Sequence, residues 1–178
     1  SHENAQVLLL DLSPSMRADD VKPSRIARAK LKALDWLKRH QEGQTALVVY
    51  SGSAHIVVPF STDTRTLSAL IPSLDTNLPP LIGNEPVQAL QLIEKMRNDN
   101  RLSRVDVMWI SDGFDADQTD AINSTLQQSS LRLSFLAVGS EAGAPVRMSD
   151  ERLLTDASGQ IVLAKVDHPR LLQWAQQQ

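Results

Sequence analysis

The sequence contains no cysteine and few aromatic residues. Its 178 residues include three tryptophans, one tyrosine and three phenylalanines. The absence of cysteine excludes disulfide bonds, zinc sites built on thiolates and a cysteine nucleophile. No apolar run approaches the ~20 residues that a helix needs to cross a membrane, and no signal peptide is recognisable. With 42% hydrophobic and 22% charged residues, the composition is that of a globular protein with a substantial core.

The charge balance is slightly acidic. A formal net charge of −3 and the lack of a basic tract argue against nucleic acid as a partner. The length predicts a single domain over residues 1–178. The chain begins at Ser1-His2 and enters an apolar stretch almost at once. We therefore expect a domain cut from a longer protein.

Short apolar runs alternate with stretches of helical periodicity along the whole chain. The second and third runs are close enough to form a hairpin, in which Pro59 favours an edge position. The alternation predicts a doubly wound, Rossmann-like α/β domain. We expect a mostly parallel six-stranded sheet with one antiparallel edge strand and helices on both faces. The expected strands are Val7–Asp11, Thr45–Tyr50, Ala54–Phe60, Val105–Ile110, Leu131–Val138 and Ile161–Ala164; the expected helices lie near 24–40, 64–71, 86–96, 118–128, 148–157 and 168–177.

The first apolar run ends in an acid followed by two hydroxyl residues, in the stretch VLLLDLSPS. Asp11, Ser13 and Ser15 are expected at the carboxyl end of a buried strand, where open α/β sheets bind ligands. Oxygen side chains at this spacing suit a hard divalent cation such as Mg2+. The alternative is structural: Asp11 or Ser13 caps the next helix, and Pro14 shapes a turn.

A second strand also ends in an acid, at Ser111-Asp112-Gly113. The two strands flank the point where the winding of the sheet reverses, so Asp11 and Asp112 are expected to face one crevice. Two carboxylates there repel each other unless a cation, a shared proton or a partner's charge separates them. The remaining acids near this edge are interpreted as solvated loop residues: Asp19, Asp20, Asp115 and Asp117.

Several enzyme and nucleotide-binding motifs are missing from the sequence. There is no phosphate-binding G-x-x-x-x-G-K-[ST] loop, and no G-x-G-x-x-G follows the first strand. Neither G-x-S-x-G nor H-E-x-x-H occurs. No nucleophile–base pair lies beside Asp11, so we expect a protein that is not an enzyme.

The two acid-containing elements resemble a known site. Asp11-Leu12-Ser13-Pro14-Ser15 is similar to the D-x-S-x-S motif of the metal-ion-dependent adhesion site (MIDAS) in von Willebrand factor A (vWA) domains. Ser111-Asp112-Gly113 resembles the distal [ST]-D-G element of that site. The resemblance covers essentially the whole chain and implies the vWA fold.

A narrower resemblance is to bacterial Bat-type aerotolerance proteins. It rests on ADDVKPSRIARAK, on GQTALVVYSGSAHIVVPFSTD and on VGSEAGAPV. It implies a domain anchored to the bacterial inner membrane and facing the periplasm. It also implies protein partners, among them other Bat-type proteins with vWA domains or tetratricopeptide repeats and a MoxR-type AAA+ ATPase system.

The resemblance also implies a ligand set. Ser13 and Ser15 match direct ligands of Mg2+, or of Mn2+ or Ca2+, while Asp11 and Asp112 match acids that act mostly through bound water. The family's third direct ligand is a threonine in a middle loop, and here Asn84 stands in its place. An amide oxygen can bind a hard cation, but Asn84 can equally cap a helix. The nearest threonine, Thr76, lies well upstream.

Three functions are compatible with these residues. The first is a non-catalytic protein-interaction module that grips a partner's acidic side chain through a divalent cation, in a membrane complex of the bacterial envelope. The second is a metal-independent scaffold whose cation site is degenerate, as the replacement at Asn84 indicates. The third is a Mg2+-dependent phosphoryl-transfer enzyme with Asp11 as nucleophile. The missing phosphate loop argues against this third function.

Overall fold

A five-stranded sheet forms the centre of the computed structural model, which describes residues 4–148 and 150–178. The order of the strands is β3-β2-β1-β4-β5. Strand β3 runs antiparallel to β2, and the other neighbouring strands are parallel. Pro59 lies in this antiparallel edge strand, as predicted. The strands are β1 (Ala5–Asp11), β2 (Gln44–Tyr50), β3 (Ala54–Ser61), β4 (Val105–Ser111) and β5 (Leu131–Ala137).

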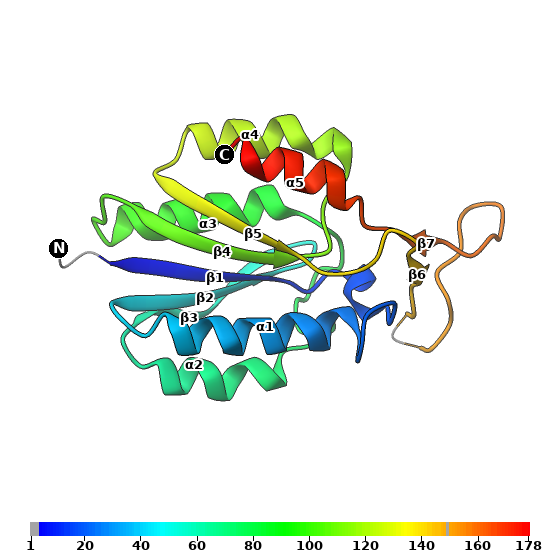
Figure 1. Cartoon of the computed structure of the whole chain (residues 1–178), viewed down its shortest axis with the longest axis horizontal. Coiled ribbons are helices and arrows are strands. Elements are labelled where there is room, and N and C mark those ends of the chain that lie inside the picture. Colours follow the sequence, from blue (N-terminus) through cyan, green and yellow to red (C-terminus); the bar gives the residue numbers. More distant parts are fainter. Residues whose placement is uncertain (1–3, 149) are drawn as a thin grey trace.

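Helices cover both faces of this sheet, which confirms the doubly wound α/β prediction (Figure 1). Helices α1 and α2 lie on one face, and α3, α4 and α5 lie on the other. The first strand is central because the chain winds outward from it through β2 to β3 and then returns to β4 on its other side. The helices are α1 (Arg25–Arg39), α2 (Thr64–Leu70), α3 (Pro86–Asp99), α4 (Thr119–Gln127) and α5 (His168–Gln176), with 3-10 turns η1 (Pro14–Arg17), η2 (Ile71–Ser73) and η3 (Ala116–Gln118).

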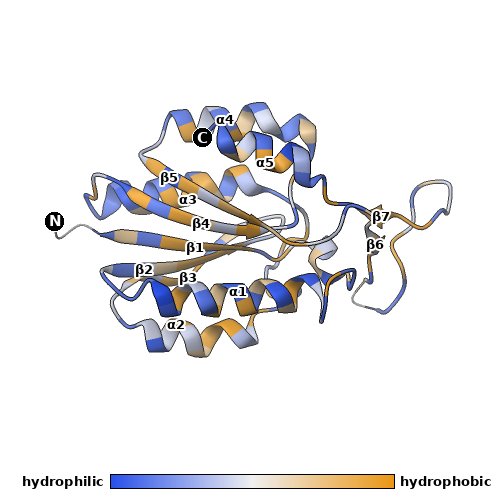
Figure 2. Cartoon of the chain, viewed as in Figure 1, coloured by the Kyte–Doolittle hydropathy of each residue, from blue (hydrophilic) through white to orange (hydrophobic). Residues whose placement is uncertain are grey.

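Strand β1 is apolar along its length because both of its faces are covered. Every residue of the strand is buried. Successive side chains of a strand point to opposite faces, so Val7 and Leu9 join the core under α3, α4 and α5. Leu8 and Leu10 join the core under α1 and α2. Figure 2 shows this as hydrophobic colour along the central strands and on the sheet-facing sides of the helices.

Four of the few aromatic rings pack together beneath α5. Trp109 of β4 stacks on Phe114, with ring centroids 5.7 Å apart, and meets Trp174 edge to face at 5.9 Å. Phe135 of β5 completes the cluster. These rings bury a large apolar area in favourable edge-to-face geometry. They hold α5 against the sheet next to the loop that follows β4.

The prediction of a sixth strand in the sheet is wrong. Leu163–Ala164 forms strand β7, but it pairs antiparallel with β6 (Ala144–Pro145) in a separate two-stranded sheet. After β5 the chain turns at Gly139, whose φ of +116° suits glycine. It then extends beyond the carboxyl edge of the sheet, as the orange segment of Figure 1 shows. The segment therefore pairs with its own local hairpin partner and not with β5.

The helix predicted over residues 148–157 is also wrong. Backbone bridges join Arg147 to Leu153 and Thr155 to Ile161. The carboxylate of Asp150 accepts a hydrogen bond from the backbone N–H of Arg152, and that of Asp156 accepts from two later residues. Such acid-to-backbone bonds stabilise turns and compete with a helix. Residue 149 lies outside the described residues.

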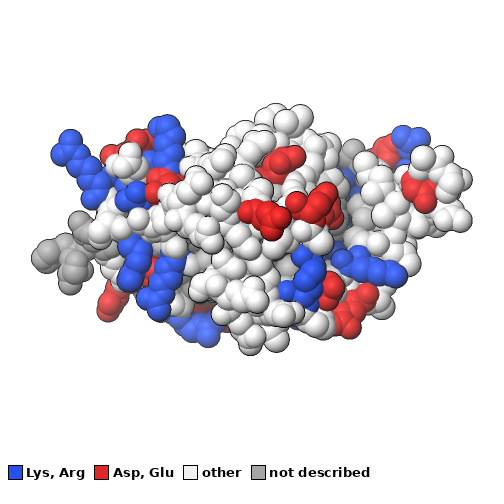
Figure 3. Space-filling view, turned by 90° about the horizontal axis from the view of Figure 1, so that it is seen from above, with Lys and Arg blue, Asp and Glu red and all other residues white. Residues whose placement is uncertain are grey.

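Charged side chains gather toward the two ends of the face formed by α4 and α5. The middle of this face is mostly uncharged and carries a small group of acidic residues (Figure 3). Within residues 4–148 and 150–178, no helix is both long and apolar enough to cross a membrane.

Candidate functional site

The structure places the two predicted acids on neighbouring segments at the carboxyl edge of the sheet. Strands β1 and β4 pair directly, with Leu10 opposite Ile110. Asp11 is the last residue of β1, and Asp112 follows the last residue of β4. Both therefore lie where the winding of the sheet reverses, the usual ligand-binding position of such folds.

Asp11 lies at the bottom of the site with no exposed surface. One carboxylate oxygen accepts a hydrogen bond from the backbone N–H of Ser13 at 2.8 Å. The other accepts from the hydroxyl of Ser111 at 2.7 Å. Burial raises the pKa of Asp11 above its ordinary value, although these hydrogen bonds oppose the shift. Asp11 therefore bonds the backbone two residues ahead, and it does not cap a helix as the alternative supposed, because the N-caps of η1 and α1 are Ser13 and Ser24.

Asp112 is 8% exposed, slightly more than Asp11. The two carboxyl groups are close enough for the charge of one to act on the other. Burial, followed by the negative charge of Asp11, raises the pKa of Asp112. Hydrogen bonds from Ser15 and from the Arg25 guanidinium lower the pKa in part. Two neighbouring buried carboxylates repel each other, and a shared proton or a nearby positive charge relieves the repulsion.

The two serines of the first motif lie beside these acids. Ser13 is buried, and its hydroxyl oxygen is 3.3 Å from that of Ser15. Ser13 occupies the N-cap position of η1, but its side chain makes no capping hydrogen bond. Its hydroxyl instead contributes to stabilising the Asp11 carboxylate. The helix-cap alternative therefore does not account for the Ser13 side chain.

Asn84 reaches the same site from the loop before α3. Its amide nitrogen donates a long hydrogen bond of 3.4 Å to the backbone oxygen of Gly113. Its Oδ1 atom is buried and has no hydrogen-bond partner among the described residues. The N-cap of α3 is Glu85 and not Asn84. A buried acceptor without a donor is costly, so a cation or a donor group beside Asn84 Oδ1 would stabilise the site.

Thr76, the other residue considered as a third ligand, is engaged elsewhere. Its hydroxyl oxygen accepts a hydrogen bond from Arg17 Nε at 2.5 Å, and the hydroxyl lies 3.1 Å from a carboxylate oxygen of Asp75. It does not line the pocket at the two acids.

The site opens into a pocket of about 450 Å3 at the carboxyl edge. One wall comes from the loop after β4 and the other from β7 and the segment that follows it. The pocket is lined by Ser15, Arg25, Asn84, residues 112–116, residues 162–165, Asp167, Arg170 and Leu171. Asp112, Ser15 and Asn84 therefore border a space large enough for a ligand group from another molecule, while Asp11 lies buried behind them.

The donor set suits a hard divalent cation. Carboxylate, hydroxyl and amide oxygens are the ligands that Mg2+ and Ca2+ prefer. In the part of the chain that the structure describes, no three His, Cys, Asp or Glu side chains are grouped to hold a metal. A cation here must therefore rely on the hydroxyls of Ser13 and Ser15 and on Asn84, in addition to Asp11 and Asp112.

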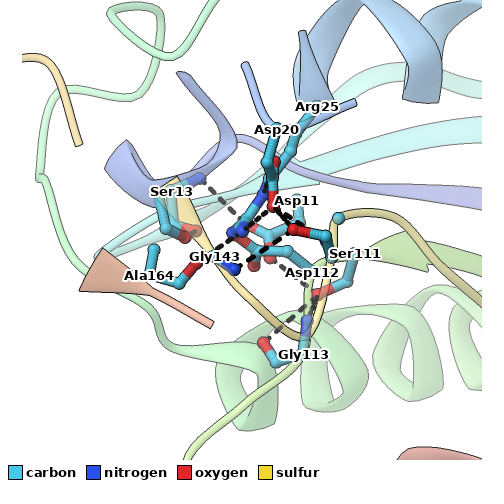
Figure 4. Close-up of polar contacts among 12 residues, drawn as sticks. Asp11, Ser13, Asp20, Arg25, Ser111, Asp112, Gly113, Gly143 and Ala164 are labelled. Carbon is cyan, nitrogen blue, oxygen red and sulfur yellow. Dashed lines mark hydrogen bonds and ion pairs between the residues drawn. The ribbon is translucent and has the colours of Figure 1, made fainter. Parts of the chain in front are cut away.

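Sequence reasoning missed the role of Arg25 and Asp20. Arg25 begins α1 and is only 1% exposed, and its guanidinium donates to Asp112 Oδ2 at 3.0 Å (Figure 4). Asp20, expected to be a solvated loop acid, has a side chain only 5% exposed and forms an ion pair of 2.7 Å with Arg25. Nothing in the local sequence distinguishes Arg25 from the other basic residues of its amphipathic helix. By contrast Asp19, Asp115 and Asp117 are exposed, as expected.

Comparisons with known proteins identify the fold. A family model described as "von Willebrand factor type A domain" matches residues 6–114. Two solved structures superpose with a TM-score of 0.81 at 21% identity, and each covers 97% of this chain. One is BatB from Bacteroides thetaiotaomicron, of which 85% is covered; the other is an aerotolerance-related membrane protein from Bacteroides fragilis, of which 87% is covered.

A von Willebrand factor type A structure from Catenulispora acidiphila is more distant. It superposes with a TM-score of 0.59 at 16% identity, over 79% of this chain and 34% of the other. No curated protein matches the sequence significantly. The match to the family model covers more than half of the chain and includes both Asp11 and Asp112. The chain belongs to the von Willebrand factor type A family.

Proposed function

We propose that this vWA domain is a non-catalytic protein-interaction module that binds an acidic side chain of a partner through a divalent cation. The observation that carries the proposal is a pocket lined by Ser15, Asn84 and Asp112, with buried Asp11 and Ser13 directly behind these residues. The cation would be Mg2+, Mn2+ or Ca2+, held by Asp11, Ser13, Ser15, Asn84 and Asp112. When bound, such a cation attracts a carboxylate to a coordination position that the protein leaves open.

The backbone positions the oxygen atoms that would hold the cation. The turn from Asp11 to Ser15 sets both serine hydroxyls toward the acids, and β4 brings Asp112 to the same level. A dication between the two carboxyl groups replaces their mutual repulsion with attraction. It also gives Asn84 Oδ1 the electrostatic partner that it lacks.

The geometry disfavours the phosphoryl-transfer alternative. A carboxylate nucleophile must reach the phosphorus of its substrate. Asp11 has no exposed surface, and each of its oxygens already accepts a hydrogen bond. This supports a binding function over an enzymatic one.

We further propose that the domain acts at a bacterial membrane, with its pocket on the periplasmic side of the inner membrane. The support is the fold similarity to a protein described as an aerotolerance-related membrane protein. Partners of the kind expected for Bat-type proteins, including other vWA or tetratricopeptide-repeat proteins and a MoxR-type ATPase system, fit this proposal.

A metal-independent scaffold is the second candidate, and one observation favours it. Arg25 already supplies a positive charge to Asp112 at 3.0 Å. The negative charge of the two acids is thus partly compensated by Arg25, without a metal ion. In this case the pocket would bind its partner through its own side chains.

Calorimetric titration of the domain with Mg2+, Mn2+ and Ca2+ tests the proposal. We expect one binding site in the wild-type domain and a large loss of affinity in the Ser13→Ala/Ser15→Ala double variant. The Ser158→Ala variant, whose hydroxyl is exposed, serves as a control and retains the affinity. If none of the three cations binds to the folded wild-type domain, the metal-independent scaffold is the correct function.

Water relaxation of the Mn2+ complex tests the open coordination position. We expect the bound cation to carry exchangeable water that acetate displaces, because acetate reproduces the carboxylate of a partner. A bound Mn2+ whose water relaxation does not respond to acetate would contradict carboxylate recognition.

A further inference from the structure

Arg25 connects the candidate cation site to a distant part of the chain. Its Nη1 donates to Asp112 Oδ2 at 3.0 Å, and its Nε and Nη2 donate to the Asp20 carboxylate at 2.8 and 2.7 Å. Its Nη2 also donates to the backbone oxygen of Ala164 in β7 at 2.5 Å. Figure 4 shows the guanidinium between these groups. One buried side chain therefore contacts the site, the loop before α1 and β7.

The Arg25 guanidinium remains charged in this environment. Burial alone lowers its pKa, but the hydrogen bonds and charges of Asp20 and Asp112 outweigh burial and raise the pKa. A buried ion pair is tolerated only when its hydrogen bonds are satisfied, and here each nitrogen of the guanidinium donates at least one bond. Asp112 thus has a fixed positive partner in the chain itself.

Asp20 and Arg25 also bind the segment between β5 and α5, which we call the arm (residues 139–148 and 150–167). Asp20 accepts hydrogen bonds from the backbone N–H and the hydroxyl of Ser140, at 2.8 and 2.6 Å. The Arg25 guanidinium packs so closely on Gly139 that a Cβ there would lie 2.7 Å from Arg25 Nε. The arm projects from the carboxyl edge of the sheet (Figure 1), so these contacts hold its base.

The arm also forms one wall of the pocket at the site. Residues 162–165 line the pocket opposite Asn84 and Asp112. Leu163, in the middle of this wall, is 48% exposed. A change in the position of β7 therefore changes the shape and the apolar surface that the pocket offers to a ligand.

We propose that Arg25 couples occupancy of the cation site to the position of the arm. This inference rests on the proposed cation binding. A dication beside Asp112 competes with the guanidinium for the carboxylate, and the two positive charges repel each other. Arg25 then gives up Asp112 Oδ2 and shifts toward Asp20. Its Nη2, which is shared between Asp20 and Ala164, gives up the Ala164 oxygen. Because the same guanidinium holds Ala164, its displacement loosens β7 and opens the wall of the pocket.

Two variants separate this coupling from a simple loss of stability. Arg25→Gln removes a positive charge near the cation, so we expect Mg2+ to bind about tenfold more tightly. Asp20→Asn leaves the charge of Arg25 in place but removes the acid that compensates it, so Mg2+ affinity falls by about tenfold. Both variants break the same ion pair. A folding defect alone would weaken Mg2+ binding in both.

The exposed ion pair between Arg39 and Asp35, at 3.2 Å, provides the matched control. Arg39→Gln and Asp35→Asn change the same charges far from the pocket, and we expect neither to alter Mg2+ affinity by more than about twofold. If Arg25→Gln and Asp20→Asn changed Mg2+ affinity in the same direction, the proposal that the charge of Arg25 opposes the cation would be overturned.

Hydrogen–deuterium exchange of the arm measures the coupling directly. In the wild-type domain we expect Mg2+ to raise the exchange rate over residues 139–148 and 160–167 by about fivefold, the effect of losing one hydrogen bond. In Arg25→Gln the arm exchanges rapidly without Mg2+ and does not respond to it. Mg2+ binding that leaves wild-type arm exchange unchanged overturns this inference alone, and an absence of Mg2+ binding overturns the proposed function with it.

Discussion

The Ser111 hydroxyl donates a hydrogen bond of 2.7 Å to the Asp11 carboxylate on the neighbouring strand. This bond is the last in a series of buried side-chain hydrogen bonds. Trp109 Nε1 donates to the Tyr50 hydroxyl at 2.9 Å, and Tyr50 donates to Ser111 at 3.4 Å. An indole N–H can only donate, so Trp109 is the first donor of the series and Asp11 is its final acceptor. Burial raises the pKa of Asp11, and the hydrogen bond at the end of this series opposes that shift by stabilising the ionised form.

Replacing Ser111 with alanine is expected to destabilise the domain by about 1–3 kcal/mol. The change removes a donor from buried Asp11 and leaves the backbone N–H of Gly113, which bonds Ser111 at 2.9 Å, without its acceptor. Urea unfolding measures the loss. Ser158→Ala is the control, because its hydroxyl donates to Asp156 at 2.6 Å on the surface. If the two substitutions lowered the free energy of unfolding equally, burial of the Ser111 hydrogen bonds would not explain the loss.

Replacing Tyr50 with phenylalanine keeps the ring and removes only the hydroxyl. We expect a loss of about 1–3 kcal/mol, because the N–H of fully buried Trp109 then has no acceptor. Chemical unfolding followed by tryptophan fluorescence measures the loss. A stability within about 0.5 kcal/mol of the wild type would mean that the N–H finds another partner.

The ion pair of Asp20 predicts a stability that falls in acid. Burial raises the pKa of Asp20, but the hydrogen bonds from Arg25 and Ser140 outweigh burial and hold the pKa well below its ordinary value of 3.8. A lowered folded-state pKa contributes stability that is present above pH 3.8 and is lost as the pH falls below it. Asp20→Asn is therefore expected to cost roughly 3–5 kcal/mol near pH 7.

The difference between wild type and Asp20→Asn should shrink steadily below pH 3.8. Urea unfolding of both proteins between pH 2 and pH 7 measures it. A difference that is independent of pH would show that Asp20 acts through packing and not through its charge.

Asn84→Ala distinguishes a cation ligand from a structural residue. The Oδ1 atom of Asn84 has no partner among the described residues, and its amide makes one long hydrogen bond. We expect the stability of the metal-free domain to change by less than about 0.5 kcal/mol. Mg2+ affinity should fall about tenfold or more, because the loss of a side chain that holds or orients a metal has an effect of this size.

The control for this prediction is Asn98→Ala, on the exposed side of α3. Calorimetry measures the affinities and urea unfolding the stabilities. A variant at Asn84 that binds Mg2+ as tightly as the wild type would exclude Asn84 from the ligand set and leave the two serines as the direct ligands.

Local sequence patterns were sufficient to predict the central sheet. The apolar runs that became β1, β2 and β4 have the lengths and apolar content of strands covered on both faces, and the run that became β5 is a partly buried edge strand. Proline has no backbone N–H to donate to a neighbouring strand, so Pro59 correctly predicted that β3 lies at an edge of the sheet. The arm was mispredicted because its short bridges and acid-stabilised turns carry no periodicity. Its path depends on Gly139 and on contacts with the loop before α1.

The candidate site was predictable only in part. Asp11, Ser13, Ser15 and Asp112 follow two recognisable strands, and the rule that ligands bind at the switch point brings them together. The unpaired Oδ1 of Asn84 depends on where the loop before α3 meets Gly113. Arg25 and Asp20 look like ordinary surface charges in the sequence, because burial of a charge is a property of all the segments packed around it.

The sequence by itself determined the doubly wound fold and the two acids at the edge of its sheet, since strand periodicity and chain order are local properties. Only the tertiary structure decided that Arg25 neutralises Asp112 and links it to the arm. Those contacts join residues 87 and 139 positions apart. Contacts at such separations form only when the segments pack together, and no local pattern encodes them.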